Sequence, residues 1–216
     1  MIKKKKIGLI GLVTIIIAVS FILRNVSGVS GGSQSVEPRT SCILDIPYFP
    51  QKTQYYCGQA CAQMILVKIQ DKYISQIRLA PEMEFIPERG TLGSNLKHPF
   101  EKRDIGIVRV GRFSNLYNLR LSVDHGQYSI LNIRYDEDSN SGHFVVVTGY
   151  NRTGFFLHDP YPKEWGTPDC RESGEDAYVS NGMLRKLWFN SRYWAITIGE
   201  PVPTDIPMVA LGEVLR

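Results

Sequence analysis

Two hydrophobic patterns follow one another along the chain, and the change falls near Gly126. Before it, apolar residues recur mostly three and four positions apart, which is typical of amphipathic helices. The clearest case is 57–70 (CGQACAQMILVKIQ), where Ala60, Met64 and Val67 share one face and predict a central buried helix. Further helices are predicted over 73–79, 93–103 and 115–125, and a short β-branched strand over 105–110.

After Gly126 the apolar segments become short and rich in β-branched and aromatic residues, which favours strands. Strands are predicted over 128–135, 143–150, 154–158 and 193–199, with a hairpin turn at Asn151–Gly154 between the second and third. Helices followed by a meander of antiparallel strands are the α+β arrangement. We therefore expect one α+β domain over 41–200.

The N-terminus carries a different signal. Residues 7–23 are an uncharged apolar run, which as a helix would span roughly 25 Å of a bilayer. Four lysines precede this run and one arginine follows it, so the positive-inside rule predicts a cytoplasmic N-terminus and an exported remainder. A cleaved signal peptide is the alternative. The length of the run and the lack of an A-x-A site favour an uncleaved anchor over 1–24, in a single-pass cell-membrane protein.

Composition and charge narrow the class of protein. The 216 residues are 43% hydrophobic and 21% charged, which is typical of a globular chain and excludes a disordered one. The net charge of +4 comes from the N-terminus, because 1–24 hold five basic residues and no acid, against 20 basic and 21 acidic residues elsewhere. The domain therefore has no basic excess for binding nucleic acid. A Gly/Ser-rich linker is predicted over 25–40 and a Pro-rich tail over 201–216.

Four cysteines are present: Cys42, Cys57, Cys61 and Cys170. In an exported protein they could form two disulfides. Alternatively, Cys57 is a nucleophile, because it begins a predicted helix whose free N–H groups and dipole lower a thiol pKa, and Gly58 leaves room for a substrate. The spacing CGQAC falls short of a zinc signature, so we expect no metal or cofactor.

His143 is the candidate base for that thiol. It opens the strand HFVVVTGY, and Asp159 ends the strand FFLHD. In an antiparallel hairpin the start of one strand lies near the end of the next, so the two side chains should meet and Asp159 should orient the imidazole. His158 points to the other face by parity, His98 precedes a proline in a loop, and His125 ends a helix.

Gln51 lies six residues before Cys57, in the loop YFPQKTQYYC. Its side-chain amide and the backbone N–H of Cys57 could together form an oxyanion hole. Gln54 is a competitor at closer spacing.

Three segments together resemble the bacteriocin-processing (double-glycine leader) peptidase family of papain-like cysteine peptidases: DIPYFPQKTQYYCGQACAQMIL, SGHFVVVTGYNRTGFFLHDPY and MLRKLWFNSRYWAITIG. The resemblance implies a papain-like fold, with N-terminal helices packed on an antiparallel sheet. It implies Cys57 as nucleophile, His143 as general base and acid, Asp159 as orienting residue and Gln51 as oxyanion donor.

The sequence departs from the family in several places. Tyr56 stands where the family often has an acidic residue, and no transporter segment is attached. Specificity for double-glycine leaders is therefore not carried over. The segments 81–90 and 163–180 match no pattern that we can name.

The sequence thus predicts a membrane-tethered extracytoplasmic cysteine peptidase that acts on a peptide or protein substrate. A non-catalytic peptide-binding module on the same fold is an alternative, which a disulfide at Cys57 would favour. An acyl or peptidyl transferase is another, because it would use the same thiol. Cys61 is expected to be buried in its helix, which leaves Cys42 and Cys170 as a possible bridge.

Overall fold

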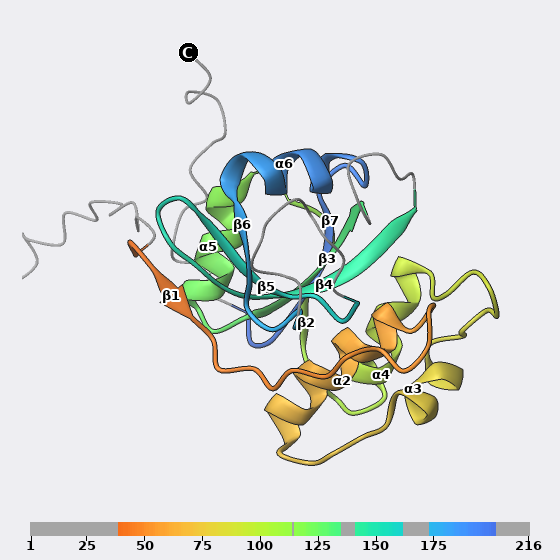
Figure 1. Cartoon of the computed structure of the whole chain (residues 1–216). Helices are drawn as coiled ribbons and strands as arrows, with labels where there is room; N and C mark the ends of the chain where they lie inside the picture. The colour runs from red at the N-terminus through yellow and green to blue at the C-terminus, as the bar shows by residue number, and fades with distance from the viewer. Residues whose placement is uncertain (1–38, 114, 135–140, 162–172, 202–216) are drawn as a thin grey trace, which may run out of the picture. The chain divides into compact units, whose positions relative to one another are not determined.

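A single antiparallel sheet organises the computed structural model of this chain, which describes residues 39–113, 115–134, 141–161 and 173–201 (Figure 1). The strand order is β2-β7-β3-β4-β5-β6, with β1 paired to β4. The strands are β1 (Cys42–Ile43), β2 (Ile107–Arg112), β3 (Tyr128–Arg134), β4 (Gly142–Tyr150), β5 (Gly154–His158), β6 (Ala177–Ser180) and β7 (Trp194–Ile198).

Helices cover both faces of the sheet. They are α2 (Cys57–Gln70), α3 (Gln76–Glu82), the 3₁₀ helix η1 (Gly93–Lys97), α4 (His98–Glu101), α5 (Leu116–Asp124) and α6 (Asn181–Phe189). Figure 1 shows α2, α3 and α4 grouped on one side of the sheet and α6 on the other. The predicted α+β class, with helices packed on an antiparallel sheet, is confirmed.

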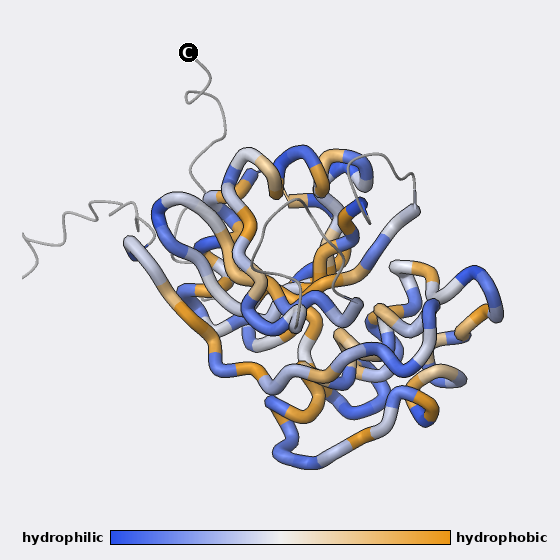
Figure 2. The backbone as a smooth tube through the Cα atoms, viewed as in Figure 1, coloured by the Kyte–Doolittle hydropathy of each residue, from blue (hydrophilic) through white to orange (hydrophobic). Residues whose placement is uncertain are grey.

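Each face of the sheet has its own hydrophobic core, and β4 contributes to both. Phe144 and Val146 belong to the core that contains the apolar face of α2. Val145 and Val147 belong to the core beneath α5 and α6. This alternation follows from the period of two along a strand, and it explains why β4 reads as an almost continuous apolar run. Figure 2 shows hydrophobic residues along the central strands and mostly hydrophilic loops at the rim.

Several predicted elements are confirmed with small shifts. α2 has the predicted bounds, β5 likewise, and the 115–125 helix is α5, which begins after the side chain of Asn115 accepts a hydrogen bond from the N–H of Asn118. The hairpin turn between β4 and β5 is held by Asn151, whose side-chain oxygen accepts from the N–H groups of Thr153 and Gly154.

Other helix predictions are wrong in their bounds. α3 begins at Gln76, because Ser75 caps it, and it runs through Pro81 instead of ending before it. The proline cannot make one backbone hydrogen bond, and the helix ends one residue after it. The single helix predicted over 93–103 is η1 followed by α4, because Pro99 near the start of α4 lacks the N–H that a continuous helix would need.

The predicted meander is correct only for β3 to β5. The last strand, β7, does not extend it but returns to pair between β2 and β3. The connection is α6, a helix that the sequence analysis missed although Ser180 caps it and Leu184, Leu187 and Trp188 follow at helical spacing. The short strands β1 and β6 were also missed.

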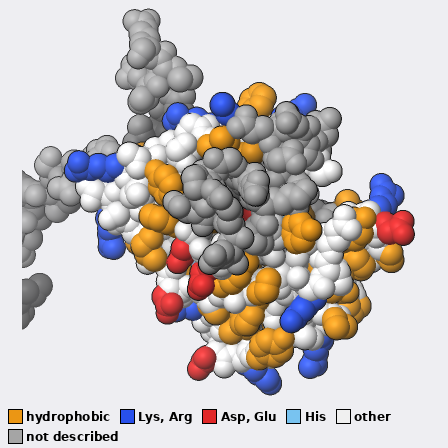
Figure 3. Space-filling view, viewed as in Figure 1, with side chains coloured by type: hydrophobic (Ala, Val, Ile, Leu, Met, Phe, Trp, Pro, Cys, Tyr) orange, Lys and Arg blue, Asp and Glu red, His pale blue; other side chains and the backbone are white. Residues whose placement is uncertain are grey.

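The predicted membrane anchor lies outside the described residues, as do the predicted linker except for 39–40 and the predicted tail except for its first residue. Within the ranges that the structure describes, no helix is both long and apolar enough to cross a membrane. On the face seen in Figure 3, basic side chains are spread around the rim with acidic side chains among them.

Candidate active site

Cys57 is the first residue of α2, as predicted. The residue before it, Tyr56, offers no side-chain cap, so the N-terminal N–H groups of the helix remain available, and that of Gly58 bonds the sulfur. Cys57 is partly exposed and is a free thiol, whereas most of the helix behind it is buried.

Gly58 has a different role from the predicted one. A side-chain carbon at this position would lie 3.2 Å from Leu96 and 3.5 Å from both Met83 and Phe144. The glycine therefore lets the start of α2 pack closely against η1, α3 and β4, and the space beside it is filled by protein instead of being open to a substrate.

His143 lies near the start of β4, and its Nε2 atom is 2.6 Å from Oδ1 of Asp159. Both side chains are buried, with 3% and 2% of their surface exposed. The register explains the contact. Val146 pairs with His158 in an antiparallel hairpin, so the residue after His158 lies toward the start of β4, where His143 is. The prediction that His143 and Asp159 lie side by side is confirmed.

The loop around Asp159 is held by several backbone contacts. The Asp159 N–H donates to the carbonyl of Gly174 (2.8 Å), and its carbonyl accepts from the hydroxyl of Tyr48 (2.9 Å). Oδ1 also accepts from the N–H of Tyr161 (2.9 Å), which fixes the carboxylate within its own turn. Sequence reasoning missed Tyr48, because nothing local links it to a residue so far along the chain.

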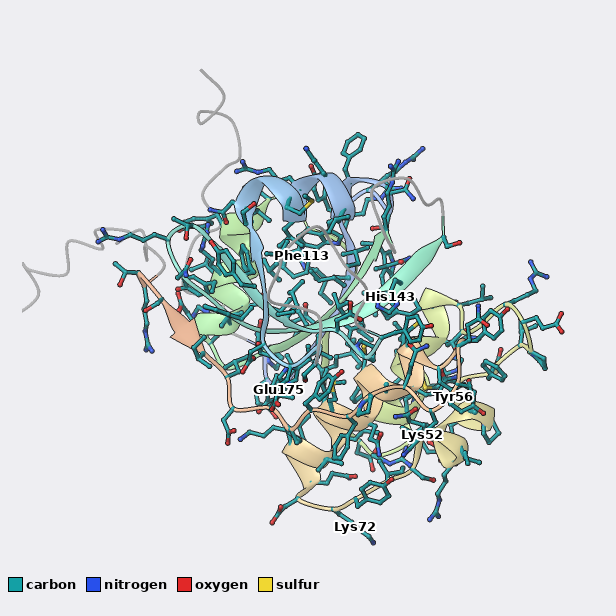
Figure 4. All side chains as sticks on the ribbon, in the orientation of Figure 1. Lys52, Tyr56, Lys72, Phe113, His143 and Glu175 are labelled. Atoms are coloured by element: carbon teal, nitrogen blue, oxygen red, sulfur yellow. The ribbon has the colours of Figure 1, made fainter. Side chains whose placement is uncertain are left out.

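Cys57 and His143 interact, and each favours the charged form of the other. Burial acts to raise the pKa of Cys57, but the hydrogen bond and charge of His143 and the N–H groups of Phe144 and Gly58 outweigh it and lower the pKa. Burial acts to lower the pKa of His143, but Asp159 and then Cys57 raise that pKa to about 10. Both shifts act in the direction of a thiolate facing an imidazolium. Figure 4 shows His143 where the sheet meets the layer of α2.

Gln51 is partly buried and lies in the loop before α2. Its backbone N–H donates to the carbonyl of Pro160 (2.9 Å), which ties this loop to the turn that carries Asp159. Its side-chain Nε2 donates to the carbonyl of Thr53 (2.8 Å), and among the described residues its Oε1 is buried without a partner. None of these bonds reaches Cys57 or His143. The competitor Gln54 is exposed.

The remaining histidines lie elsewhere, as expected. His158 is buried between the carbonyl of Ile46, 2.8 Å from its Nε2, and the N–H of Asp176, 3.0 Å from its Nδ1. His125 follows α5, as predicted, whereas His98 begins α4 and does not lie in the predicted loop, because a proline is tolerated in the first turn of a helix. Within the described ranges, no group of three or more His, Cys, Asp or Glu side chains could hold a metal ion.

The three described cysteines are not paired with one another. Cys61 is fully buried, as expected, and burial together with the neighbouring Cys57 raises the pKa of its thiol well above the usual range. Cys42 forms no disulfide with another described residue, and Cys170 lies outside the described residues, so the possible bridge between them stays a prediction. The reading in which all four cysteines are paired is wrong, because two of the three described cysteines would then have to bond each other and all three are free.

Three solved structures resemble this fold at low sequence identity. A candidate C39-like peptidase from Bacillus anthracis has a TM-score of 0.57 and 16% identity over 76% of this chain and 100% of its own. A double glycine motif protease from an AMS/PCAT transporter, in complex with the leader peptide, has a TM-score of 0.56 and 14% identity over 77% and 99%. The peptidase domain of Streptococcus ComA, a bi-functional ABC transporter, has a TM-score of 0.52 and 16% identity over 70% and 97%.

No curated protein matches the sequence. The model of the Peptidase_C39 like family matches residues 43–184, which include the start of α2, the β4–β5 hairpin and the turn after it. That match covers most of the domain and agrees with the fold of the three structures. The chain therefore belongs to the Peptidase_C39 like family.

Proposed function

We propose that this member of the family is a cysteine peptidase that hydrolyses peptide bonds through Cys57, His143 and Asp159. The observation that carries the proposal is the position of His143. One ring nitrogen bonds a buried carboxylate at 2.6 Å, and the imidazole also bonds the thiol at the N-terminus of α2. Acyl transfer requires a nucleophile that contacts a base, and a base that contacts an orienting group.

The reaction would run in two halves. The Cys57 thiolate attacks the carbonyl carbon, a C–S bond forms, and the electron pair of the C=O bond moves to oxygen. The oxyanion is bound by the backbone N–H of Cys57 and the side-chain amide of Gln51. When the C–N bond breaks, His143 gives its proton to the leaving amine. Water then attacks the thioester, His143 takes a proton from it, and the acid and the Cys57 thiolate are released.

The substrate class that we propose is a peptide or protein. One structural relative is a protease in complex with a leader peptide, which supports a peptide substrate but not a particular leader sequence for this chain. The free Cys57 thiol supports an enzyme over the non-catalytic binding module, because the module was favoured by a disulfide at that position.

We further propose that the catalytic domain acts outside the cytoplasm, tethered by the apolar run 7–23. The support is the run itself, the four lysines before it and the neutral domain after it. Secretion after cleavage of the same segment is the alternative.

The test combines thiol labelling with peptide cleavage. The purified full chain in detergent is treated with iodoacetamide at pH 5 to 9, the modified cysteine is mapped, and a fluorogenic peptide mixture is assayed in parallel. We expect Cys57 to react well below pH 8.5, ahead of the buried Cys61, and Cys57→Ala to abolish cleavage. Labelling of Cys57 only near pH 8.5, or cleavage that survives Cys57→Ala, would overturn the proposal.

A further inference from the structure

We infer that Gln76 is a positioning residue for the oxyanion site, because its buried carboxamide fixes the backbone on both sides of Gln51. The inference rests on the proposed function, since Gln51 needs to be aimed only if an oxyanion forms beside it.

Gln76 is the first residue of α3, and only 1% of its surface is exposed. Its Nε2 donates to the carbonyl of Pro50 (2.9 Å), and its Oε1 accepts from the N–H of Lys52 (2.8 Å). The two bonds bracket Gln51 in the chain. Because the N–H of Gln51 itself donates to the carbonyl of Pro160, three successive residues of this loop are held through their own backbone groups.

The same carboxamide connects the loop to the helix that carries the nucleophile. The Nε2 of Gln76 also donates to Oε1 of Gln63 (2.8 Å), which lies on α2 and has 1% of its surface exposed. Gln63 in turn donates to the carbonyl of Ile74 (2.6 Å), just before α3. The position of the Gln51 loop is thus set relative to α2, on which Cys57 lies.

The side chain of Gln51 depends on this arrangement. Among the described residues it makes one hydrogen bond, to Thr53 within its own loop, so the direction of its amide follows the loop backbone. An oxyanion donor acts only when its N–H lies about 3 Å from the oxygen that develops charge. A loop that shifts by about 1 Å would therefore lose much of the effect.

Only a carboxamide meets the requirements at position 76. The site needs two donors, for Pro50 and Gln63, and one acceptor, for Lys52, all from one side-chain end. A carboxylate cannot donate and an ammonium cannot accept. Gln76→Glu is therefore a close isostere that keeps the contact with Lys52 and breaks the other two.

The experiment compares Gln76→Glu with Gln51→Ala and the double variant, in the full chain. Removal of one oxyanion donor lowers kcat by roughly a hundred- to thousandfold, and we expect Gln76→Glu to lower it by about ten- to hundredfold with KM unchanged. Alkylation of Cys57 by iodoacetamide should keep its rate, because no oxyanion forms in that reaction. The double variant should be no slower than Gln51→Ala, since a donor that is absent cannot be misplaced.

A matched control is Gln127→Glu. Gln127 is another buried carboxamide, with 4% of its surface exposed, and its Nε2 donates to the carbonyl of Glu200 next to the end of β3 that is remote from His143. The Gln127→Glu variant should have a lower free energy of unfolding than the wild type but the same kcat. If Gln76→Glu is recovered unfolded, Gln76→Asn, which keeps donor and acceptor one methylene shorter, should show the same fall in kcat with intact alkylation.

The outcomes separate the two proposals. If the wild type does not cleave the peptides, or Cys57→Ala still does, the proposed function fails and this inference with it. If cleavage depends on Cys57 but Gln76→Glu keeps its kcat, or the two losses multiply in the double variant, only the positioning role of Gln76 is overturned.

Discussion

His143 uses its two ring nitrogens for two different partners. Nε2 bonds Asp159, which leaves Nδ1 for Cys57. The Asp159 carboxylate stabilises the imidazolium, and the imidazolium stabilises the Cys57 thiolate. The pKa of His143 is therefore raised and that of Cys57 lowered by the same chain of contacts.

The pH dependence of catalysis follows from that pair. The active form needs Cys57 ionised and His143 protonated, so activity begins above the lowered pKa of Cys57 and is lost as the pH rises through the raised pKa of His143. We expect kcat/KM for peptide cleavage to rise as Cys57 ionises and to fall only near pH 10. A profile that falls between pH 6 and 7, like that of an unperturbed histidine, would contradict this.

Asp159→Asn should change that profile in a defined direction. It removes the main cause of the raised pKa of His143, so the alkaline limb of the profile should move to lower pH. Alkylation of Cys57 at pH 7 should slow, and kcat/KM should fall by roughly a hundredfold. The measurement is the same pH series with the variant.

The matched control for this variant is Asp176→Asn. The Asp176 carboxylate lies 3.6 Å from the buried His158, which makes it a second Asp–His pair outside the site. It should leave both pH limbs of catalysis in place. A similar shift in both variants would mean that His143 responds to the overall charge of the domain and not to its contact with Asp159.

At the scale of elements, a nearly buried ion pair joins α3 to the residues after α4. The Arg103 guanidinium bonds both carboxylate oxygens of Glu82, at 2.6 and 3.2 Å, and also the carbonyl of Pro99. Burial acts to raise the pKa of Glu82, but Arg103 and Lys102 outweigh it and lower that pKa. The pair therefore fixes the small helices against which the start of α2 packs.

Arg103→Ala should lower the free energy of unfolding by about 2 kcal/mol at pH 7. Because the folded pKa of Glu82 is lowered, its contribution is complete above the unfolded pKa and is lost as the pH falls through the folded one. The difference between wild type and variant should therefore shrink in acid, as measured by urea unfolding at pH 7 and pH 3. Lys97→Ala, which breaks an exposed pair with Glu101, should cost under about 0.5 kcal/mol at either pH.

How much could be predicted from the sequence depended on how local each contact is. α2 and the β4–β5 hairpin were predicted because helical periodicity and an Asn-Gly-bounded turn act within a few residues. The same hairpin brings His143 to Asp159, so that pair could also be predicted. The resemblance to a peptidase family supplied what local reasoning could not, which was a preference for Gln51 over Gln54.

The rest could not be predicted, for a physical reason that particular contacts make clear. Tyr48 reaches Asp159 across 111 residues of chain, and Gln76 reaches Pro50 across 26. Such contacts depend on how elements pack, not on the residues next to them. The return of β7 to a place beside β3 is of the same kind, since pairing partners of a strand are not encoded in its own pattern.

At the scale of the whole molecule, the sheet separates two cores, and the reactive groups come from one helix layer and from the sheet itself. Cys57 begins a helix of one layer, whereas His143 and Asp159 lie at the ends of the strands between the layers. The described part of both cores is built entirely from residues within 42–198.

Deletion of residues 1–24 should therefore separate location from catalysis. In the full chain we expect the protein in the membrane fraction, resistant to carbonate extraction, with a C-terminal tag open to protease in intact cells. The deletion variant should be in the soluble fraction and cleave the same peptides with unchanged kcat, because the cores and the site are intact. A soluble full-length product whose N-terminus begins after residue 24 would instead establish a cleaved signal peptide. A tag protected in intact cells would overturn the extracytoplasmic location, because the five positive charges of 1–24 would then not have set the orientation of the chain.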